Sequence, residues 1–197
     1  MAKILVLYHS RLGSVEKIAN LIARGVNAID GVEAAIRTVP NISANTQSSE
    51  SSVPDTGAPY VTLDDLKNCD GLILGSPTRF GNMSAEMKHF IDSTSSVWMS
   101  GELQGKPAAV FSSSSSMHGG QESTLLSMML PLLHHGMLLV GIPYSEPALS
   151  QTTTGGTPYG ATHVSGSNNQ NSITEDEKIL SIALGQRVAK VAQKLKH

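Results

Sequence analysis

The amino-acid sequence predicts an α/β fold built on a doubly wound, five-stranded parallel sheet. Along the 197 residues, five short apolar runs alternate with segments of helical period. The first run, residues 4–8, is apolar without interruption, as is typical of a central parallel strand covered on both faces. We find no internal repeat and no interdomain linker. We therefore expect one domain spanning residues 1–197, a length that suits a single hydrophobic core.

The first half of the chain shows two strand–helix units. After the first strand, helical spacing relates Val15, Ile18, Ile22, Val26 and Ile29. Gly31 should end this helix, and residues 33–39 follow as the second strand. The third strand is predicted at 71–75. Asn82 is the expected N-cap of the next helix, whose apolar face carries Met83, Met87, Phe90 and Ile91.

The second half continues the alternation. Strands are expected at 108–111 and 137–140. The helix between them has an apolar face expected to comprise Leu125, Leu126, Met129 and Leu133. Residues 174–177 form a capping box before a closing helix, whose first residues, 175–178, should be solvated. The apolar stripe of that helix is Leu180, Leu184, Val188, Val191 and Leu195. Two stretches, 41–59 and 141–173, show no regular period and are expected to be insertions.

Composition excludes several classes of function. The net charge is −2 and no run of Lys or Arg forms a basic stripe, so we expect no nucleic-acid partner. The single cysteine, Cys69, excludes an intrachain disulfide and fits a reducing compartment. No segment approaches the roughly 20 apolar residues that a membrane span needs. We therefore expect a soluble, cytoplasmic protein.

The loop after the first strand has the composition of an anion-binding turn. In an open α/β sheet, ligands bind beyond the carboxyl ends of the strands. Here Ser10, Gly13 and Ser14 precede a new helix, whose N-terminus attracts negative charge. The loop matches neither the dinucleotide fingerprint nor the Walker A pattern. A mononucleotide phosphate is the better interpretation, with an ordinary turn as the alternative.

The loops after the third and fourth strands suit a flat ligand. In residues 77–82, Arg79 beside Phe80 offers a planar cation and a planar apolar face to a ring that bears carbonyl groups. Residues 112–116 are all serines and precede residues 117–120, Met-His-Gly-Gly. Small hydroxyl residues let a flat ligand approach the backbone, although low complexity is the alternative. Because the three loops meet at one edge of the sheet, we expect a binding site there.

Four stretches of the chain resemble the WrbA family of FMN-dependent NAD(P)H:quinone oxidoreductases, which are related to flavodoxins. They are residues 1–8, 75–84 (GSPTRFGNMS), 134–137 (HHGM) and 155–161 (GGTPYGA). The resemblance extends over nearly the whole chain. It implies a flavodoxin-like fold with strand order 2-1-3-4-5, FMN as cofactor, and a quinone and NAD(P)H as substrates. It further implies a homotetramer in which a neighbouring subunit completes each site.

The resemblance also implies roles for individual residues. The FMN phosphate would be held by Ser10, Arg11, Leu12, Gly13, Ser14 and Val15. The isoalloxazine would be lined by Pro77, Thr78, Arg79, Phe80, Ser113, Ser114, Ser115, Ser116, Met117, His118 and Gly119. His134 would lie near the ring, and Leu12 and Trp98 would contact substrates. The family commonly has an aromatic residue where Leu12 stands and a glycine-rich loop where this chain has its serines.

Charge favours an enzyme over an electron carrier. One-electron carriers of this fold surround the flavin with carboxylates, whereas residues 77–83 hold Arg79 and no acid, and residues 112–121 hold no carboxylate. A cation there favours the anionic two-electron product. The implied reaction is ping-pong: NAD(P)H reduces the flavin, leaves, and is replaced by a quinone. His134 is the candidate proton donor, although cavity lining or capping also explains it.

The residues leave two other functions open and disfavour a metal site. A flavodoxin-like one-electron carrier would use the same fold and cofactor. A non-enzymatic interaction protein would use residues 141–173 as its binding surface. A metal site is not expected, because the adjacent His134 and His135 cannot comfortably point at one ion and no carboxylate is suitably spaced.

Overall fold

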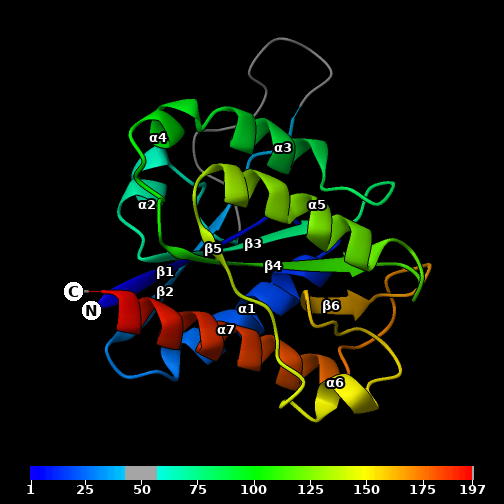
Figure 1. Ribbon diagram of the computed structural model, residues 1–197. Helices are drawn as coiled ribbons and strands as arrows, with labels where there is room; N and C mark the ends of the chain where they lie inside the picture. Colours follow the sequence, from blue (N-terminus) through cyan, green and yellow to red (C-terminus); the bar gives the residue numbers. More distant parts are fainter. Residues whose placement is uncertain (43–56, 197) are drawn as a thin grey trace.

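A computed structural model describes residues 1–42 and 57–196, and it has the predicted parallel sheet at its centre (Figure 1). The sheet order is β2-β1-β3-β4-β5, with every pairing parallel, which confirms the predicted topology. The strands are β1 (Ala2–Tyr8), β2 (Val32–Thr38), β3 (Gly71–Pro77), β4 (Pro107–Ser114) and β5 (Leu138–Leu139). Most of the 41–59 insertion lies outside the described residues.

A sixth strand, β6 (Gly160–Val164), also pairs with β4. The first residues of β4 pair with β5, and Val110 to Ser114 pair with β6, so two short strands share one edge of β4. A Cβ at Gly160 would lie 2.0 Å from the carbonyl oxygen of Val110, so this pairing requires glycine. The expectation that 141–173 is irregular is therefore wrong: the segment holds both β6 and α6 (Ala148–Gln151).

Two long helices cover one face of the sheet. They are α1 (Ser14–Asn27) and α7 (Glu175–Leu195), which lie against each other below the sheet in Figure 1. Their backbones approach closely at two glycines. A Cβ at Gly25 would lie 2.1 Å from the carbonyl oxygen of Ile182, and a Cβ at Gly185 would lie 2.1 Å from that of Ile22. The predicted apolar stripes of both helices are buried at Ile18, Ile22, Leu180, Leu184 and Val188.

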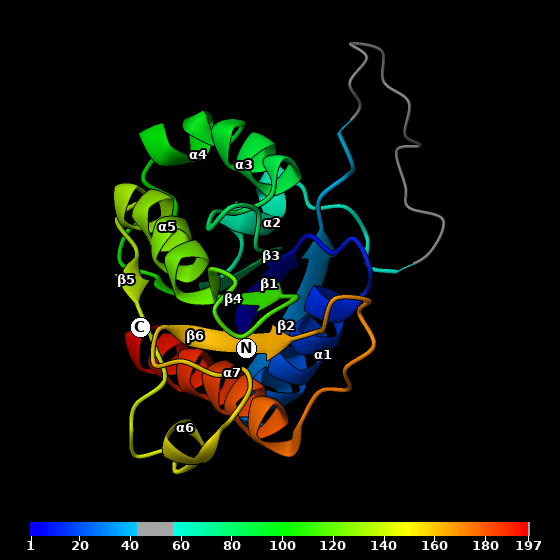
Figure 2. The same cartoon turned by 90° about the vertical axis from the view of Figure 1, so that its right-hand side faces the viewer.

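Four helices cover the opposite face, and Figure 2 shows the resulting layers around the sheet. They are α2 (Leu63–Lys67), α3 (Ala85–Asp92), α4 (Ser95–Met99) and α5 (Gln121–His134). The predicted face of α3 is confirmed, since Met83 and Met87 are buried and Phe90 and Ile91 pack against the same core. None of the helices in the described ranges is both long and apolar enough to cross a membrane.

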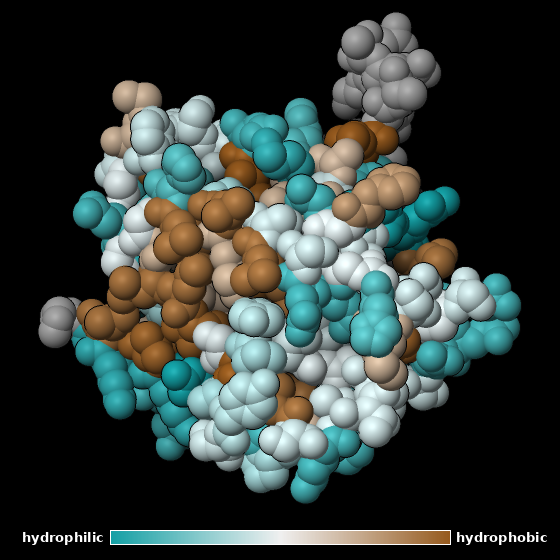
Figure 3. All heavy atoms as spheres, turned by 45° about the vertical axis from the view of Figure 1, so that its right-hand side comes forward, coloured by the Kyte–Doolittle hydropathy of each residue, from teal (hydrophilic) through white to brown (hydrophobic). Residues whose placement is uncertain are grey.

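The buried face of α5 differs from the predicted one. Leu125, Met128 and Leu132 are buried, whereas Leu126 and Leu133 are about half exposed. The helix therefore turns a neighbouring row of side chains into the core. Because α5 is apolar on more than one side, its leucines alone do not specify which row faces the sheet. Figure 3 shows the resulting apolar patch over the side of the molecule where α5 and β5 lie.

The helix α3 begins later than predicted. Ser84, not Asn82, is the N-cap of α3, and its side chain accepts a hydrogen bond from the Met87 amide. The cause is a tight turn in which Arg79 and Asn82 exchange backbone hydrogen bonds of 2.8 and 3.0 Å. Phe80 (φ 51°) and Gly81 (φ 76°) take left-handed conformations within it. This turn delays the start of the helix by two residues.

Candidate functional site

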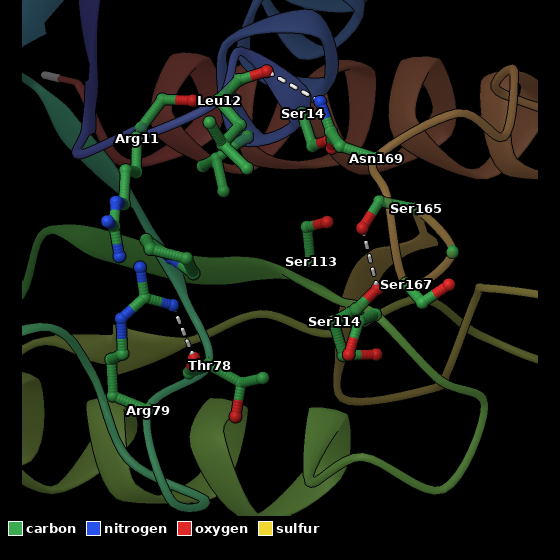
Figure 4. Close-up of a pocket in the computed structure, with 15 residues that line it drawn as sticks. Arg11, Leu12, Ser14, Thr78, Arg79, Ser113, Ser114, Ser165, Ser167 and Asn169 are labelled. Carbon is green, nitrogen blue, oxygen red and sulfur yellow. Dashed lines mark hydrogen bonds between the residues drawn. The ribbon is translucent and has the colours of Figure 1, made fainter.

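A pocket of about 250 Å³ opens at the carboxyl ends of β1, β3 and β4, as predicted for this fold (Figure 4). It is lined by Ser10, Arg11, Leu12, Ser14, Val15, Pro77, Thr78, Arg79, Ser113, Ser114, Ser115, Ser165, Gly166, Ser167 and Asn169. The three loops singled out from the sequence therefore meet in one place. A fourth segment, 165–169, joins them and was not predicted.

The loop between β1 and α1 presents donors without partners. Gly13 takes a left-handed conformation (φ 84°) as the N-cap of α1, and no side chain caps the helix. The first intrahelical bond runs from the Lys17 amide to the Gly13 carbonyl, so the preceding amides have no partner inside the helix. The hydroxyl of Ser10 is buried without a hydrogen-bond partner in the described structure. These groups fit a bound phosphate.

The residues after β3 are held by bonds to β4 and α5. The Thr78 amide donates to the carbonyl of Ser113 at 3.0 Å, and the Thr78 hydroxyl lies 2.6 Å from that of Thr124. The guanidinium of Arg79 donates to the Thr78 carbonyl at 2.8 Å. The turn that carries Arg79 is thus fixed before any ligand binds.

The serine run is divided between a strand and a loop. Ser112, Ser113 and Ser114 belong to β4, so the prediction that the strand ends before them is wrong. Their backbones pair with β3 and β6, so their backbone polar groups are paired within the sheet. The Ser114 hydroxyl donates to the carbonyl of Ser116 and accepts from the side-chain amide of Gln121 at 2.9 Å.

The 165–169 segment closes the pocket between two of the predicted loops. The Ser165 amide donates to the Ser114 carbonyl at 2.8 Å. At the other end, the Asn169 side-chain amide donates to the Leu12 carbonyl at 2.7 Å, and its oxygen accepts from the Ser14 hydroxyl. Asn169 has a φ of 57°, which asparagine tolerates better than most residues. The Asn-rich composition of 168–171 was the only sequence signal for this contact.

Glu177 anchors the chain on either side of this segment. Its carboxylate accepts hydrogen bonds from the amides of Gly155, Val164 and Thr174 and lies 2.8 Å from Nδ1 of His163. The capping box is confirmed. The expectation of a solvated helix start is wrong for this residue, which is 1% exposed. Burial alone would raise its pKa, but the bonds from His163 and the backbone hold the pKa below its usual value.

Several predicted residues lie outside the pocket. Phe80 projects fully into solvent. Gly13, Ser116 and Gly119 do not line the pocket. Met117 and His118 line a neighbouring hollow with Thr154 and Thr157.

His134 and Trp98 lie together at the C-terminal end of α5, about 20 Å along the helix from its N-terminal end, where the serine-rich loop after β4 leads into the helix. The Trp98 indole, which is on α4, donates to the His134 carbonyl at 2.9 Å. His134 ends α5 as predicted, followed by a left-handed Gly136 (φ 74°). Neither side chain lines the pocket.

The pocket is cationic. Its lining includes Arg11 and Arg79 and no aspartate or glutamate. Within the described ranges, no carboxylate forms an ion pair with either guanidinium. A site with unpartnered amides at a helix N-terminus, serine hydroxyls and two arginines is suited to a ligand that carries phosphate and develops further negative charge.

Comparisons with known proteins agree with this chemistry. Residues 2–148 match the family described as NADPH-dependent FMN reductase. An NAD(P)H dehydrogenase (quinone) from Syntrophobacter fumaroxidans is 40% identical, with 98% of each chain covered. A WrbA-like flavodoxin from Agrobacterium tumefaciens shares the fold with a TM-score of 0.71 and 24% identity over all of both chains. A flavodoxin from the domain Archaea has a TM-score of 0.63 and 20% identity, with 99% of each chain covered.

Proposed function

The chain belongs to the NADPH-dependent FMN reductase family, and we propose that it is an FMN-dependent NAD(P)H:quinone oxidoreductase. The observation that carries the proposal is the pocket itself. It combines free donors for one phosphate with a cationic wall that contains no carboxylate. The name of the 40% identical relative supplies the electron donor and the class of acceptor.

The residues of the pocket divide into a phosphate end and a ring end. The Ser10 hydroxyl and the amides after Gly13 would hold the phosphate of FMN, and the Ser14 hydroxyl, which donates to Asn169, borders the same end of the pocket. Thr78, Arg79 and residues 113–115 would border the isoalloxazine. Met117 and His118, in the adjoining hollow, would border its outer edge. When bound, FMN supplies the capacity to take hydride from NAD(P)H and to pass two electrons to a quinone.

Arg79 gives the site the charge of an enzyme rather than that of a one-electron carrier. Its guanidinium is held against the Thr78 carbonyl at the pocket wall, where it would favour negative charge on a bound isoalloxazine. The exposed Leu12 side chain would pack against the nicotinamide from the opposite loop. A single open pocket would receive donor and acceptor in turn, which is the basis for the proposed ping-pong order.

The position of His134 and Trp98 supports an oligomeric site. Because they lie about 20 Å along α5 from the serine loop, they can serve a flavin only in a neighbouring subunit. Leu126, Leu130, Leu133 and Leu138 are exposed in the same region and would be covered in such an assembly. We therefore propose a homotetramer in which His134 and Trp98 reach the substrate cavity of a neighbour. The buried single cysteine, Cys69, agrees with a cytoplasmic location.

Cofactor binding and turnover test the proposal together. Calorimetric titration of the purified protein should show tighter binding of FMN than of FAD, because the pocket has one phosphate end. Steady-state assays with NADH and a benzoquinone should then give parallel double-reciprocal lines. Tighter binding of FAD would contradict the cofactor assignment. Absence of quinone reduction by protein that has bound FMN would contradict the activity and favour the carrier or the interaction protein.

A further inference from the structure

We propose that Arg11 and Arg79 together form a subsite for a phosphoryl group of the nicotinamide nucleotide that donates electrons. The inference rests on the proposed function and deepens it, because it assigns the recognition of the donor to two named side chains. It concerns the mouth of the pocket rather than the phosphate end, which is formed by Ser10 and the start of α1.

The two side chains come from different loops and converge. Arg11 follows β1 and Arg79 follows β3, and both line the same pocket. Figure 4 shows their guanidinium groups pointing toward one another at one side of the pocket, away from Ser14 and Asn169 at the phosphate end. Arg79 is fixed by its bond to the Thr78 carbonyl, whereas the Arg11 side chain is exposed and makes no hydrogen bond within the described residues. One guanidinium is thus preorganised and the other is available.

Charge indicates what this arrangement binds. Like charges that approach one another repel, and in the described ranges no carboxylate pairs with either arginine. A bridging anion removes this repulsion. The planar fork of a guanidinium matches the oxygens of a phosphoryl group, so two such forks can share one pyrophosphate or phosphate.

Neither FMN nor a quinone requires a phosphoryl subsite between Arg11 and Arg79, so this position is available to the nucleotide donor. The phosphate of FMN has its own donors at the α1 N-terminus, on the far side of Leu12. A simple quinone carries no charge. NADH and NADPH share a pyrophosphate, and NADPH has an additional 2′-phosphate. The subsite therefore distinguishes the donor from the acceptor in a pocket that both must use.

The variant Arg11→Gln tests the proposal, with Arg24→Gln as its matched control. Arg24 is exposed in the last turn of α1, remote from the pocket. In Arg11→Gln, the KM for the nucleotide donor should rise roughly tenfold, the effect expected for losing one charge-assisted hydrogen bond at an exposed site. The kcat at saturating donor and the KM for the quinone should stay unchanged. An N-benzyl dihydronicotinamide, which has no phosphate, should be oxidised equally by wild type and variant.

Three donors identify the phosphoryl group. An equal rise in KM for NADH and NADPH assigns the pyrophosphate, and a rise confined to NADPH assigns the 2′-phosphate. An equal loss with the phosphate-free donor, or no loss with either nucleotide, would overturn the proposal. So would a loss explained by weaker FMN binding in a separate titration.

Calorimetric titration of the FMN-loaded protein with ADP-ribose and with 2′-phospho-ADP-ribose tests the subsite without turnover. In Arg11→Gln, the affinity for both should fall roughly tenfold if the subsite binds the pyrophosphate, and the affinity for the 2′-phosphorylated form alone should fall if it binds the 2′-phosphate; Arg24→Gln should change neither. If the protein does not reduce quinones but binding of either compound still depends on Arg11, the proposed function fails and the subsite stands. If turnover is as proposed but both compounds bind the variant as tightly as wild type, the subsite fails alone.

Discussion

Asn169 should hold the phosphate loop in its binding conformation. Its side chain donates to the Leu12 carbonyl at 2.7 Å and accepts from the Ser14 hydroxyl, so it ties the 165–169 segment to the start of α1. The variant Asn169→Gly removes both bonds and keeps a residue that adopts a φ near 57° without strain. Each bond contributes about 0.5–1.5 kcal/mol, and partial exposure places both near the lower value.

Together the two bonds contribute about 1 kcal/mol, and losing them corresponds to a roughly fivefold weaker affinity for FMN. Titration of flavin fluorescence with FMN and with riboflavin measures it. Because Asn169 acts on the phosphate loop, riboflavin affinity should change little. Asn168→Gly is the matched control, since Asn168 is exposed and adding glycine there loosens the same segment. An unchanged FMN affinity in Asn169→Gly, or an equal loss in the control, would refute the reasoning.

Three further predictions concern the flavin, the core and the cysteine. Arg79→Gln should lower the midpoint potential of the bound flavin by tens of millivolts. A unit charge about 8 Å away at a dielectric of about 20 contributes roughly 2 kcal/mol, which for two electrons is about 45 mV. An unchanged potential, measured by dye equilibration, would mean that Arg79 only holds the loop in place. Glu177→Gln should lower the free energy of unfolding in urea by roughly 2 kcal/mol at neutral pH. The folded pKa of Glu177 lies below its ordinary value of 4.5, so the ionised carboxylate stabilises the fold above that pH, and this stabilisation is lost as pH falls through the folded pKa. The difference in unfolding free energy between wild type and Glu177→Gln should therefore shrink in acid. A difference that stays constant with pH would contradict a stabilising role for the ionised carboxylate. Burial raises the pKa of Cys69 to about 11, so a thiol reagent should label it at neutral pH only after unfolding.

Most of the sheet could be predicted because burial leaves a clear pattern in the sequence. The apolar run of β1 and the stripes of α1 and α7 specify elements that pack on both sides of one sheet. The three loops of the site followed from the rule that ligands bind at the carboxyl ends of parallel strands. The order of the first five strands came from the family resemblance, since periodicity alone leaves it open.

The missed features depend on contacts between distant residues. The strand β6 is short and contains two buried polar residues: the Thr162 hydroxyl accepts from the Gly156 amide, and the His163 ring bonds Glu177 of α7. Asn169 joins the site through a carbonyl that lies 157 residues earlier in the chain. Leu126 and Leu133 misled the assignment of the buried face of α5, because an exposed apolar residue resembles a core residue in sequence.

The most direct test of the proposed activity follows the two half-reactions of the bound flavin separately. FMN-loaded protein is mixed rapidly with NADH without oxygen, and the visible absorbance of the flavin is recorded. It should bleach in a phase that no quinone accelerates, with no accumulated flavin radical. Mixing the reduced protein with a benzoquinone should then restore the absorbance at a rate at least equal to turnover. A flavin that NADH does not reduce, or one that stops at a stable radical, would contradict a two-electron NAD(P)H:quinone oxidoreductase.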